Sequence, residues 1–190
     1  MAGDAVRVGQ GWDIHRLVAG RALRLSGVDV PGDRGLLGHS DGDVVLHAVT
    51  DALLGALAAG DIGQRFPDSD PRYRGIDSAL LLGEVVELVS ARGYRIGNVD
   101  VTILAEQPKL APHMPAMQRR LGELLGVEAE QVGIKAKTME ALGPIGAGEA
   151  IAALAVATVA EARRAAAQRL RSRTRSAPPR SRPPRRSRKR

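Results

Sequence analysis

The stretch from Gly38 to Gly63, GHSDGDVVLHAVTDALLGALAAGDIG, decides the fold of this chain of 190 residues. Apolar residues recur at helical spacing from Val45 to Ala56, and Ser40 or Asp41 can cap the first turn with a side-chain oxygen. We therefore predict an amphipathic helix that begins next to these two residues and ends near Gly60.

Elements of both types surround this helix. Alternating apolar residues with Gly or Pro boundaries predict strands at 6–15, 21–30, 95–104 and 131–137. Caps and helical periodicity predict two further helices, one from Asp77 or Ser78 to Gly93 and one at 112–125. The segment 64–74 has the turn residues of a loop, and 142–150 those of a glycine-rich turn. Composition favours a helix at the alanine-rich segment 149–159, although the pattern does not settle it. The simplest architecture is α+β, a single domain with one mixed sheet covered by helices on one face.

The composition excludes several classes of protein. The chain has no cysteine, which excludes a disulfide scaffold, a thiolate zinc site and a cysteine nucleophile. It has neither an apolar window of about 18 residues nor the pattern of a secretory signal. We therefore expect a soluble, cytoplasmic protein without a membrane span.

Charge divides the chain into two parts. The net charge is +7, yet residues 163–190 carry 13 Lys and Arg and no acid. The remaining 15 basic and 21 acidic residues give residues 1–162 a net charge of −6. The end of the chain, RSRTRSAPPRSRPPRRSRKR, has too few apolar side chains to offset the entropy of ordering. We predict a folded domain at 1–162 and a disordered basic tail at 163–190.

Three of the four histidines lie in acidic motifs. On a strand, Asp13 and His15 point to the same side, and His47 on the predicted helix can join them. Two imidazoles and one carboxylate form a three-ligand set with which zinc keeps a position open for substrate. The alternative is a core histidine and a turn acid, and a lone Asp-x-His pair does not decide between the two.

Other polar residues suit phosphate or a second cation. His39 and Ser40 precede a helix N-terminus, where free N–H groups and the helix dipole attract anions, although the acids beside them can be ordinary caps. Asp61–Gly63 and Phe66–Asp70 offer carboxylates to a cation or to sugar hydroxyls, or form an acidic surface loop. The side chains of Lys135–Glu140 can meet phosphate oxygens or stay solvated. Each of these motifs is a weak indication of a binding site by itself. Only their combined order and spacing along the chain is specific for one function.

Four segments, taken in order, resemble one enzyme family. They are GQGWDIHRL at 9–17, GHSDGDVVLHAVTDALLGALAAGDIGQRFPDSDP at 38–71, NVDVTILAEQPKLAPH at 98–113 and IKAKTMEALGPIGAGEAIAA at 134–153. Over residues 6–160 the chain resembles the 2-C-methyl-D-erythritol 2,4-cyclodiphosphate synthases of the non-mevalonate isoprenoid pathway. The resemblance implies a phosphorus–oxygen lyase acting on 4-diphosphocytidyl-2-C-methyl-D-erythritol 2-phosphate, whose 2-phosphate attacks the β-phosphorus so that CMP leaves. This reaction brings two anionic phosphates together, and metals and preorganised donors neutralise such charge.

The resemblance also implies roles for individual residues. Asp13, His15 and His47 match the ligands of zinc or another divalent cation, and His39 with Thr138 matches the catalytic pair that stabilises the transition state. A second ion, Mg²⁺ or Mn²⁺, is implied at the substrate diphosphate, with Glu140 as its candidate ligand. The implied substrate-binding residues are Asp13, His15, His39, Ser40, Asp61, Ile62, Gly63, Phe66, Pro67, Asp68, Ser69, Asp70, Ala105, Glu106, Gln107, Pro108, Lys109, Leu110, Ala111, Lys137, Thr138, Met139 and Glu140.

The resemblance further implies a homotrimer with its sheets toward the centre and its active sites between adjacent subunits. It makes 149–159 a strand at the trimer interior, against the alanine composition. Two other functions compete with the cyclase. A metal-dependent phosphohydrolase can use the same three ligands without needing a nucleotide loop at 105–111. The basic tail can bind nucleic acid or another polyanion, or it is simply a solvated low-complexity extension.

Overall fold

The computed structural model describes residues 5–162, so the tail at 163–190, for which the sequence predicts disorder, lies outside the described residues. Three 3-10 turns, at 71–73, 111–113 and 129–131, accompany the main elements. Within residues 5–162, none of the helices has the length and apolar character needed to cross a bilayer. The strands and helices are β1 (Val6–Ala19), β2 (Leu23–Leu25), β3 (Val28–Val30), β4 (Arg34–Leu37), α1 (Val44–Ala56), α2 (Ile62–Arg65), α3 (Ser78–Ala91), β5 (Tyr94–Leu104), α4 (Met114–Leu125), β6 (Val132–Lys137), α5 (Gly143–Gly146) and β7 (Ala150–Glu161).

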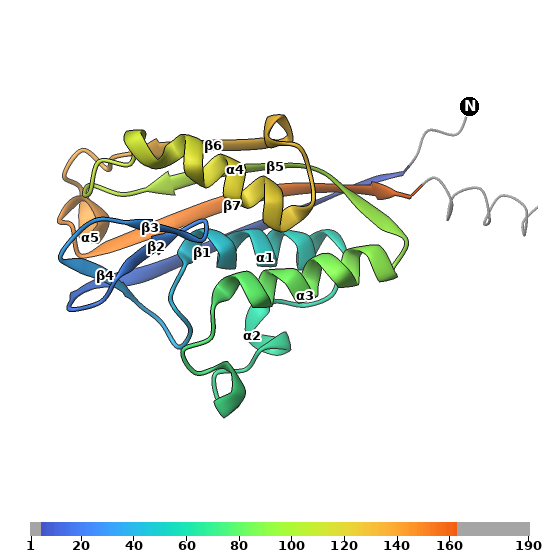
Figure 1. Ribbon diagram of the computed structural model, residues 1–190, viewed down its shortest axis with the longest axis horizontal. Coiled ribbons are helices and arrows are strands. Elements are labelled where there is room, and N and C mark those ends of the chain that lie inside the picture. The colour runs from blue at the N-terminus through green and yellow to red at the C-terminus, as the bar shows by residue number, and fades with distance from the viewer. Residues whose placement is uncertain (1–4, 163–190) are drawn as a thin grey trace, which may run out of the picture.

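A five-stranded sheet forms the centre of the domain, in the order β4-β1-β7-β5-β6 (Figure 1). Neighbouring strands are antiparallel except for β5 and β6, which are parallel. Helices α1, α3 and α4 pack on one face of this sheet and enclose the apolar core with it. The predicted α+β architecture, a mixed sheet with helices on one face, is confirmed.

The alanine-rich segment is the central strand β7, as the resemblance implied and against its helix propensity. It pairs with β1 along one edge and with β5 along the other. Ala153, Ala155 and Ala157 are fully buried on the side of the sheet that α1 covers. Because hydrogen bonds on both edges hold the strand in place, tertiary pairing outweighs the intrinsic preference of alanine.

Two glycines of β1 let α1 rest directly on the strand backbone. A Cβ atom built on Gly11 would lie 1.9 Å from the carbonyl oxygen of Ala48, and one built on Gly9 would lie 1.9 Å from that of Ala52. No side chain fits in either gap, because protein interiors are close-packed. The glycines therefore set the distance between β1 and α1.

The structure corrects the predicted strand at 21–30. This segment is a hairpin in which β2 and β3 pair with each other and turn at Ser26 and Gly27. The two turn residues have φ angles of 57° and 70°, and successive positive φ angles are typical of the tight hairpin turn. The sequence analysis also missed β4, a strand of four residues that pairs with the far end of β1.

The N-cap of α1 is Asp43, and the predicted caps Ser40 and Asp41 were wrong. The Asp43 carboxylate accepts hydrogen bonds from four backbone N–H groups, two in the first turn of α1 and two in the β2–β3 turn. Burial raises the pKa of Asp43 to about 6, although the N–H donors partly offset this effect. Asp43 thus ties the hairpin to α1 and leaves Ser40 and Asp41 free for other contacts.

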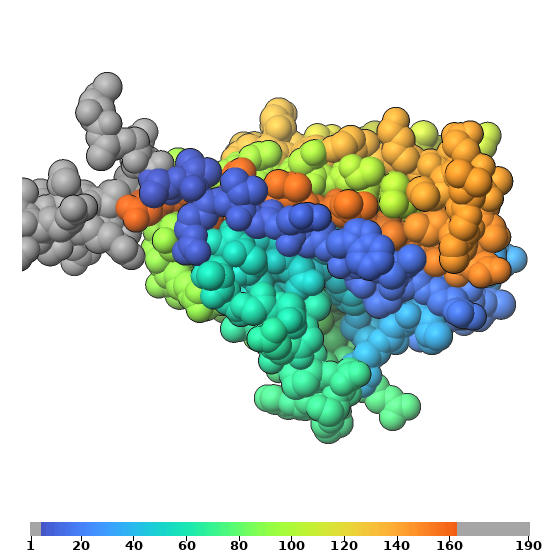
Figure 2. Space-filling model, turned by 180° about the vertical axis from the view of Figure 1, so that it is seen from behind, coloured from blue at the N-terminus to red at the C-terminus, as the bar shows by residue number. Residues whose placement is uncertain are grey.

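Figure 2 shows the molecule from behind, with atoms of β1 and β7 at the surface. Apolar side chains on this opposite face of the sheet are exposed. Val8 and Trp12 on β1 are 64% and 51% exposed, and Val156 on β7 is 42% exposed. The short helix α5 covers one end of this open face, where Ile145 packs against Ala152. Several exposed apolar side chains on one face of a sheet are typical of a surface that contacts another molecule.

Candidate metal and phosphate site

Strand β1 and helix α1 bring three metal-ligating side chains together. His47 Nδ1 on α1 lies 2.9 Å from Asp13 Oδ2 and 3.1 Å from His15 Nε2. His15 Nε2 lies 3.2 Å from the same carboxylate oxygen. Two ligand atoms bonded at about 2 Å to one tetrahedral zinc ion are roughly 3.3 Å apart. The spacing of this triad therefore suits a single divalent cation.

The electrostatics of the triad also suit a cation. Burial by itself raises the pKa of Asp13, but the hydrogen bond with His47 and the charges of both imidazoles bring that pKa below its ordinary value. Burial lowers the pKa of His15, and the attraction of Asp13 offsets this only in part. Near neutral pH Asp13 is thus a carboxylate and His15 a neutral imidazole, which are the forms that bind metal.

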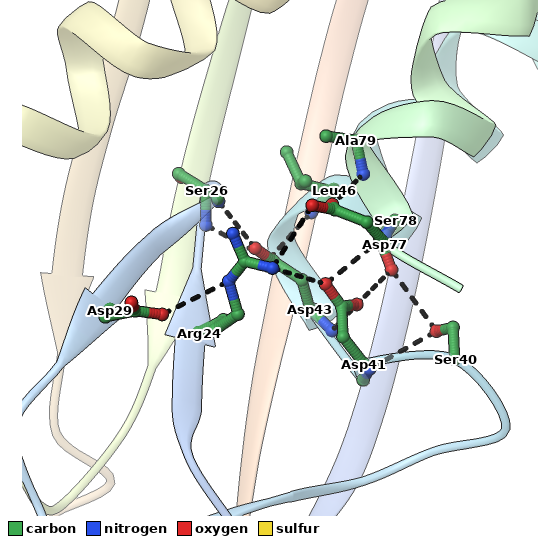
Figure 3. Close-up of polar contacts among 12 residues, drawn as sticks. Arg24, Ser26, Asp29, Ser40, Asp41, Asp43, Leu46, Asp77, Ser78 and Ala79 are labelled. Carbon is green, nitrogen blue, oxygen red and sulfur yellow. Dashed lines mark hydrogen bonds and ion pairs between the residues drawn. The ribbon is translucent and has the colours of Figure 1, made fainter. Parts of the chain in front are cut away.

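The second ring nitrogen of His47 faces buried hydroxyl groups. His47 Nε2 lies 2.9 Å from Ser78 Oγ and 3.0 Å from Ser40 Oγ. Ser78 is only 1% exposed, and its hydroxyl donates a hydrogen bond of 2.5 Å to Asp41 Oδ1. Figure 3 shows Ser40, Asp41 and Ser78 converging between the β4–α1 loop and the start of α3.

The β4–α1 loop, which carries His39, Ser40 and Asp41, is fixed from two sides. The N–H of Gly75 donates to the carbonyl oxygen of His39 at 2.8 Å, and the N–H of Asp41 donates to that of Ile76 at 3.0 Å. From β2, Arg24 Nη1 lies 3.4 Å from Asp41 Oδ2 (Figure 3). The loop is therefore anchored both to the segment before α3 and to the hairpin.

A cavity of about 190 Å³ lies beside the triad. Its walls combine charged and hydroxyl groups from β1, the β4–α1 loop and α1 with apolar groups from α2, the following loop and α3. Several predicted site residues meet here, and the cavity is lined by Asp13, His15, His39, Ser40, His47, Ile62, Gly63, Phe66, Asp68, Tyr73 and Leu81. This arrangement can hold a cation next to an anionic group.

The remaining predicted residues of the 61–70 segment do not line the cavity. Asp61 caps α2 through the N–H of Gln64, and Asp70 caps the 3-10 turn that follows and pairs with Arg72. Pro67 and Ser69 belong to the same loop without lining the cavity.

The predicted nucleotide-binding residues gather at the ends of β5 and β6. The N–H of Ala105 donates to the carbonyl oxygen of Lys137 at 3.0 Å, and the N–H of Met139 donates to Glu106 Oε2 at 3.2 Å. The Thr138 hydroxyl donates to Glu140 Oε1 at 2.9 Å. In the same loop, Leu110 is buried, Gln107 and Pro108 line a second cavity of about 170 Å³, and Lys109 and Ala111 are exposed.

The sheet register separates this nucleotide group from the metal triad. Ile14 on β1 pairs with Ala152 on β7, Ala152 pairs with Leu104 on β5, and Leu104 pairs with Lys137 on β6. Paired residues share a face, so Lys137 points to the open face, whereas the triad points to the helices. Three strand spacings, roughly 14 Å, also separate β1 from β6. Within the described part of one chain, the two groups do not meet.

The sequence analysis missed the part that Ser78, Tyr73 and Leu81 play in this site. It treated Asp77 and Ser78 as alternative caps of one helix. Only Asp77 serves as the cap, accepting from the N–H of Ala79, and this leaves the Ser78 hydroxyl available to His47. Because Asp77 alone can cap the helix, the Ser78 hydroxyl next to it was not needed for capping, and this was the sequence feature that could have identified Ser78. No such feature marked Tyr73 or Leu81.

Comparison with known proteins places these motifs in one family. A model of the YgbB family matches residues 6–160. The 2-C-methyl-D-erythritol 2,4-cyclodiphosphate synthase of Synechococcus sp. strain JA-2-3B'a(2-13) is 59% identical over 148 residues, which are 78% of this chain and 94% of the relative. A solved structure of such a synthase in its CDP-bound form has a TM-score of 0.75 and 42% identity, covering 80% of this chain and 99% of that one. The CDP complex of IspF from Plasmodium falciparum has a TM-score of 0.74 and 33% identity, with coverage of 85% and 99%. The chain therefore belongs to the YgbB family, whose curated relatives are 2-C-methyl-D-erythritol 2,4-cyclodiphosphate synthases.

Proposed function

We propose that this chain is a 2-C-methyl-D-erythritol 2,4-cyclodiphosphate synthase. It converts 4-diphosphocytidyl-2-C-methyl-D-erythritol 2-phosphate to the cyclic diphosphate and releases CMP. The observation that carries this proposal is the triad of Asp13, His15 and His47 beside a cavity walled by His39 and Ser40. The family and the names of its relatives support the same activity.

Zinc or another divalent cation is the expected occupant of the triad. One carboxylate and two imidazole nitrogens, at 2.9–3.2 Å from one another, fit its ligand preferences and leave a position open for a phosphate oxygen. When bound, the ion would act as a Lewis acid that draws negative charge away from a phosphate oxygen.

The residues of the chain bind the substrate and exclude water. His39 and Ser40 receive the phosphates, and the methylerythritol hydroxyls lie against the segments Asp61–Gly63 and Phe66–Asp70. An oxygen of the 2-phosphate attacks the β-phosphorus, the bond from that phosphorus to the bridging oxygen breaks, and CMP leaves with the bridging oxygen. His39 and Thr138 stabilise the charge that develops on the transferred phosphorus centre.

The cytidine diphosphate portion binds at Ala105–Ala111 and Lys137–Glu140. Lys109 and Lys137 are cations that can offset the charge of the diphosphate. Glu140 is the candidate protein ligand of a second ion, Mg²⁺ or Mn²⁺, because hard cations prefer carboxylate oxygen. The relatives solved with CDP support a nucleotide ligand of this type.

A homotrimer supplies the complete site. In one chain Lys137 points to the open face of the sheet, whereas the metal triad points to the helix-covered face three strands away. The open face also carries Val8, Trp12 and Val156, which a neighbouring copy would bury. We therefore place each active site between adjacent subunits, with the open faces of the sheets turned toward the trimer axis.

Release of CMP and formation of the cyclic diphosphate test this function. We expect both products from the diphosphocytidyl substrate, loss of both after complete chelation of metal, and recovery when zinc and magnesium return. His47→Ala should lose bound metal and activity together, whereas Glu87→Gln on the exposed side of α3 should retain both. Activity in fully metal-depleted protein would contradict the metal-assisted mechanism, and inorganic phosphate without cyclic product would favour a phosphohydrolase.

A further inference from the structure

Behind the metal triad lies a chain of polar groups that the proposed reaction does not use. It runs from Arg24 on β2 through Asp41 to Ser78 (Figure 3). From Ser78 it continues to the rear ring nitrogen of His47. Ser78 is 1% exposed, and the Asp41 side chain is 15% exposed. Buried polar groups of this kind persist where each donor has an acceptor.

The donors around Asp41 fix the direction of the first hydrogen bond. Arg24 Nη1 lies 3.4 Å from Asp41 Oδ2, and the backbone N–H groups of Asp43 and Ser78 donate to the same carboxylate at 3.2 and 3.3 Å. The arginine and the two N–H groups can only donate, so the Asp41 carboxylate is the acceptor in each of these contacts. The Ser78 hydroxyl proton therefore points to Asp41 Oδ1.

This direction determines the next hydrogen bond. Once its only proton is donated to Asp41, Ser78 Oγ can act only as an acceptor toward its other neighbours. The contact of 2.9 Å with His47 Nε2 then requires the proton to be on that nitrogen. When a cation takes the place of the hydrogen bond between Nδ1 and Asp13, a neutral His47 with Nε2 protonated has its lone pair on Nδ1, the atom that faces Asp13 and His15.

We propose that Ser78 and Asp41 are positioning residues that hold His47 in the Nε2–H tautomer and so present Nδ1 to the metal. The proposal rests on the metal site of the proposed function. It also explains why Ser40 lies in this cluster, since Ser40 Oγ accepts from the N–H of Gly42 at 3.2 Å. With Nε2 protonated, the Ser40 hydroxyl does not donate to His47, and its proton points to Ser78 Oγ, an acceptor 3.2 Å away.

Zinc affinity tests the proposal without reference to turnover. Competition with a chromophoric chelator would compare the full-length wild-type chain with Ser78→Ala and Asp41→Ala. We expect roughly 10- to 100-fold weaker zinc binding in both variants, the range typical for loss of a hydrogen-bond partner behind a metal ligand. Ser78→Thr keeps the hydroxyl and should restore affinity to within about threefold of wild type, a margin well below that range.

Two control variants match these changes. Ser90→Ala removes an exposed hydroxyl from the same helix, α3. Asp77→Ala removes the cap of α3 and another carboxylate that pairs with Arg24, so it weakens the fold at the same place without touching Ser78 Oγ. Both should bind zinc as wild type does, which separates positioning of His47 from general destabilisation.

Histidine ¹⁵N spectra of the zinc-loaded wild-type chain provide a test that needs no variant. We expect His47 with a protonated Nε2 and a metal-bound Nδ1. A protonated Nδ1, or Ser78→Ala binding zinc as tightly as Ser90→Ala, would overturn the proposal. Failure of wild type to bind zinc would overturn both this proposal and the metal mechanism, whereas weakened zinc binding in Ser78→Ala without cyclase activity in wild type would overturn only the proposed function.

Discussion

Gly11→Ala should disrupt the metal triad through packing, without changing any ligand. The added Cβ would lie 1.9 Å from the carbonyl oxygen of Ala48, about 1.5 Å closer than an ordinary contact, and 2.8 Å from the backbone nitrogen of Ala52. Both neighbours are backbone atoms of α1, so no side-chain rotation relieves the overlap. The helix must move away from β1 by about the same distance, and this kind of overpacking costs on the order of 3 kcal/mol.

The displacement matters more for the metal than for the fold. Gly11 is two residues from Asp13 on β1, and Ala48 follows His47 on α1. A metal site tolerates deviations of only about 0.2 Å in its bond lengths. A shift of more than 1 Å between the two elements should therefore lower zinc affinity by at least about 100-fold, because it removes one of three ligands.

Chelator competition for zinc and urea unfolding in EDTA measure the two effects separately. Gly9→Ala makes the same overlap with Ala52 two residues farther from the ligands, so it should cost similar stability but less zinc affinity. Gly83→Ala on α3 meets nothing within 4 Å and should stabilise the protein by about 0.5–1 kcal/mol. A Gly11→Ala protein with wild-type stability and wild-type zinc affinity would refute the idea that this contact sets the triad.

Three further changes test other parts of the structure. Asp43→Ala leaves four backbone N–H groups without their acceptor, so urea unfolding should show a free energy of unfolding lower by about 3 kcal/mol. A decrease below about 1 kcal/mol would contradict the idea that Asp43 links the β2–β3 hairpin to α1. Burial raises the pKa of Asp51 more than the hydrogen bond from Ile62 lowers it, so Asp51→Asn should stabilise the metal-free protein at pH 7. That gain should disappear below about pH 4, where Asp51 is protonated in the folded and unfolded states alike, and a pH-independent gain in urea unfolding would contradict the reasoning. Val156→Asp on the open face should give a monomer by light scattering, whereas Leu80→Asp on α3, at a side chain that is 61% exposed, should stay trimeric; a trimeric Val156→Asp protein would remove the open face from the interface.

Strand and helix spacing made the metal triad one of two interpretations, and the resemblance to the synthase family implied Asp13, His15 and His47 as its ligands. Residues that are two positions apart on a strand point to the same side of the sheet, so the predicted strand places the side chains of Asp13 and His15 next to each other. The apolar periodicity predicted the helix that carries His47, and the resemblance implied that His47 joins the pair. Both elements are long and strongly patterned, so each was predicted from local sequence, whereas the packing that brings them together was not.

The parts that sequence reasoning missed depend on contacts between residues that are distant in the sequence. Asp43 is the cap of α1 because the β2–β3 turn supplies two of its four donors, and nothing local distinguishes it from Ser40 or Asp41. The turn at Ser26 and Gly27 divides a stretch whose alternation predicts one strand. Ser78 matters to the site only because α3 starts beside His47.

The small residues of β7 explain two observations: the composition of this strand is typical of a helix, and α1 can pack closely against the sheet at the metal triad. Ala153, Ala155 and Ala157 pair with Asp13, Gly11 and Gly9, so α1 lies over a surface made only of small side chains and backbone. Valine or isoleucine at these positions of β7 would have made the strand evident from composition. Their added volume would also have lifted α1 away from β1, and His47 Nδ1 would no longer lie 2.9 Å from the Asp13 carboxylate. Small residues are therefore required here by the geometry of the metal triad, and a strand that meets this requirement has the composition of a helix.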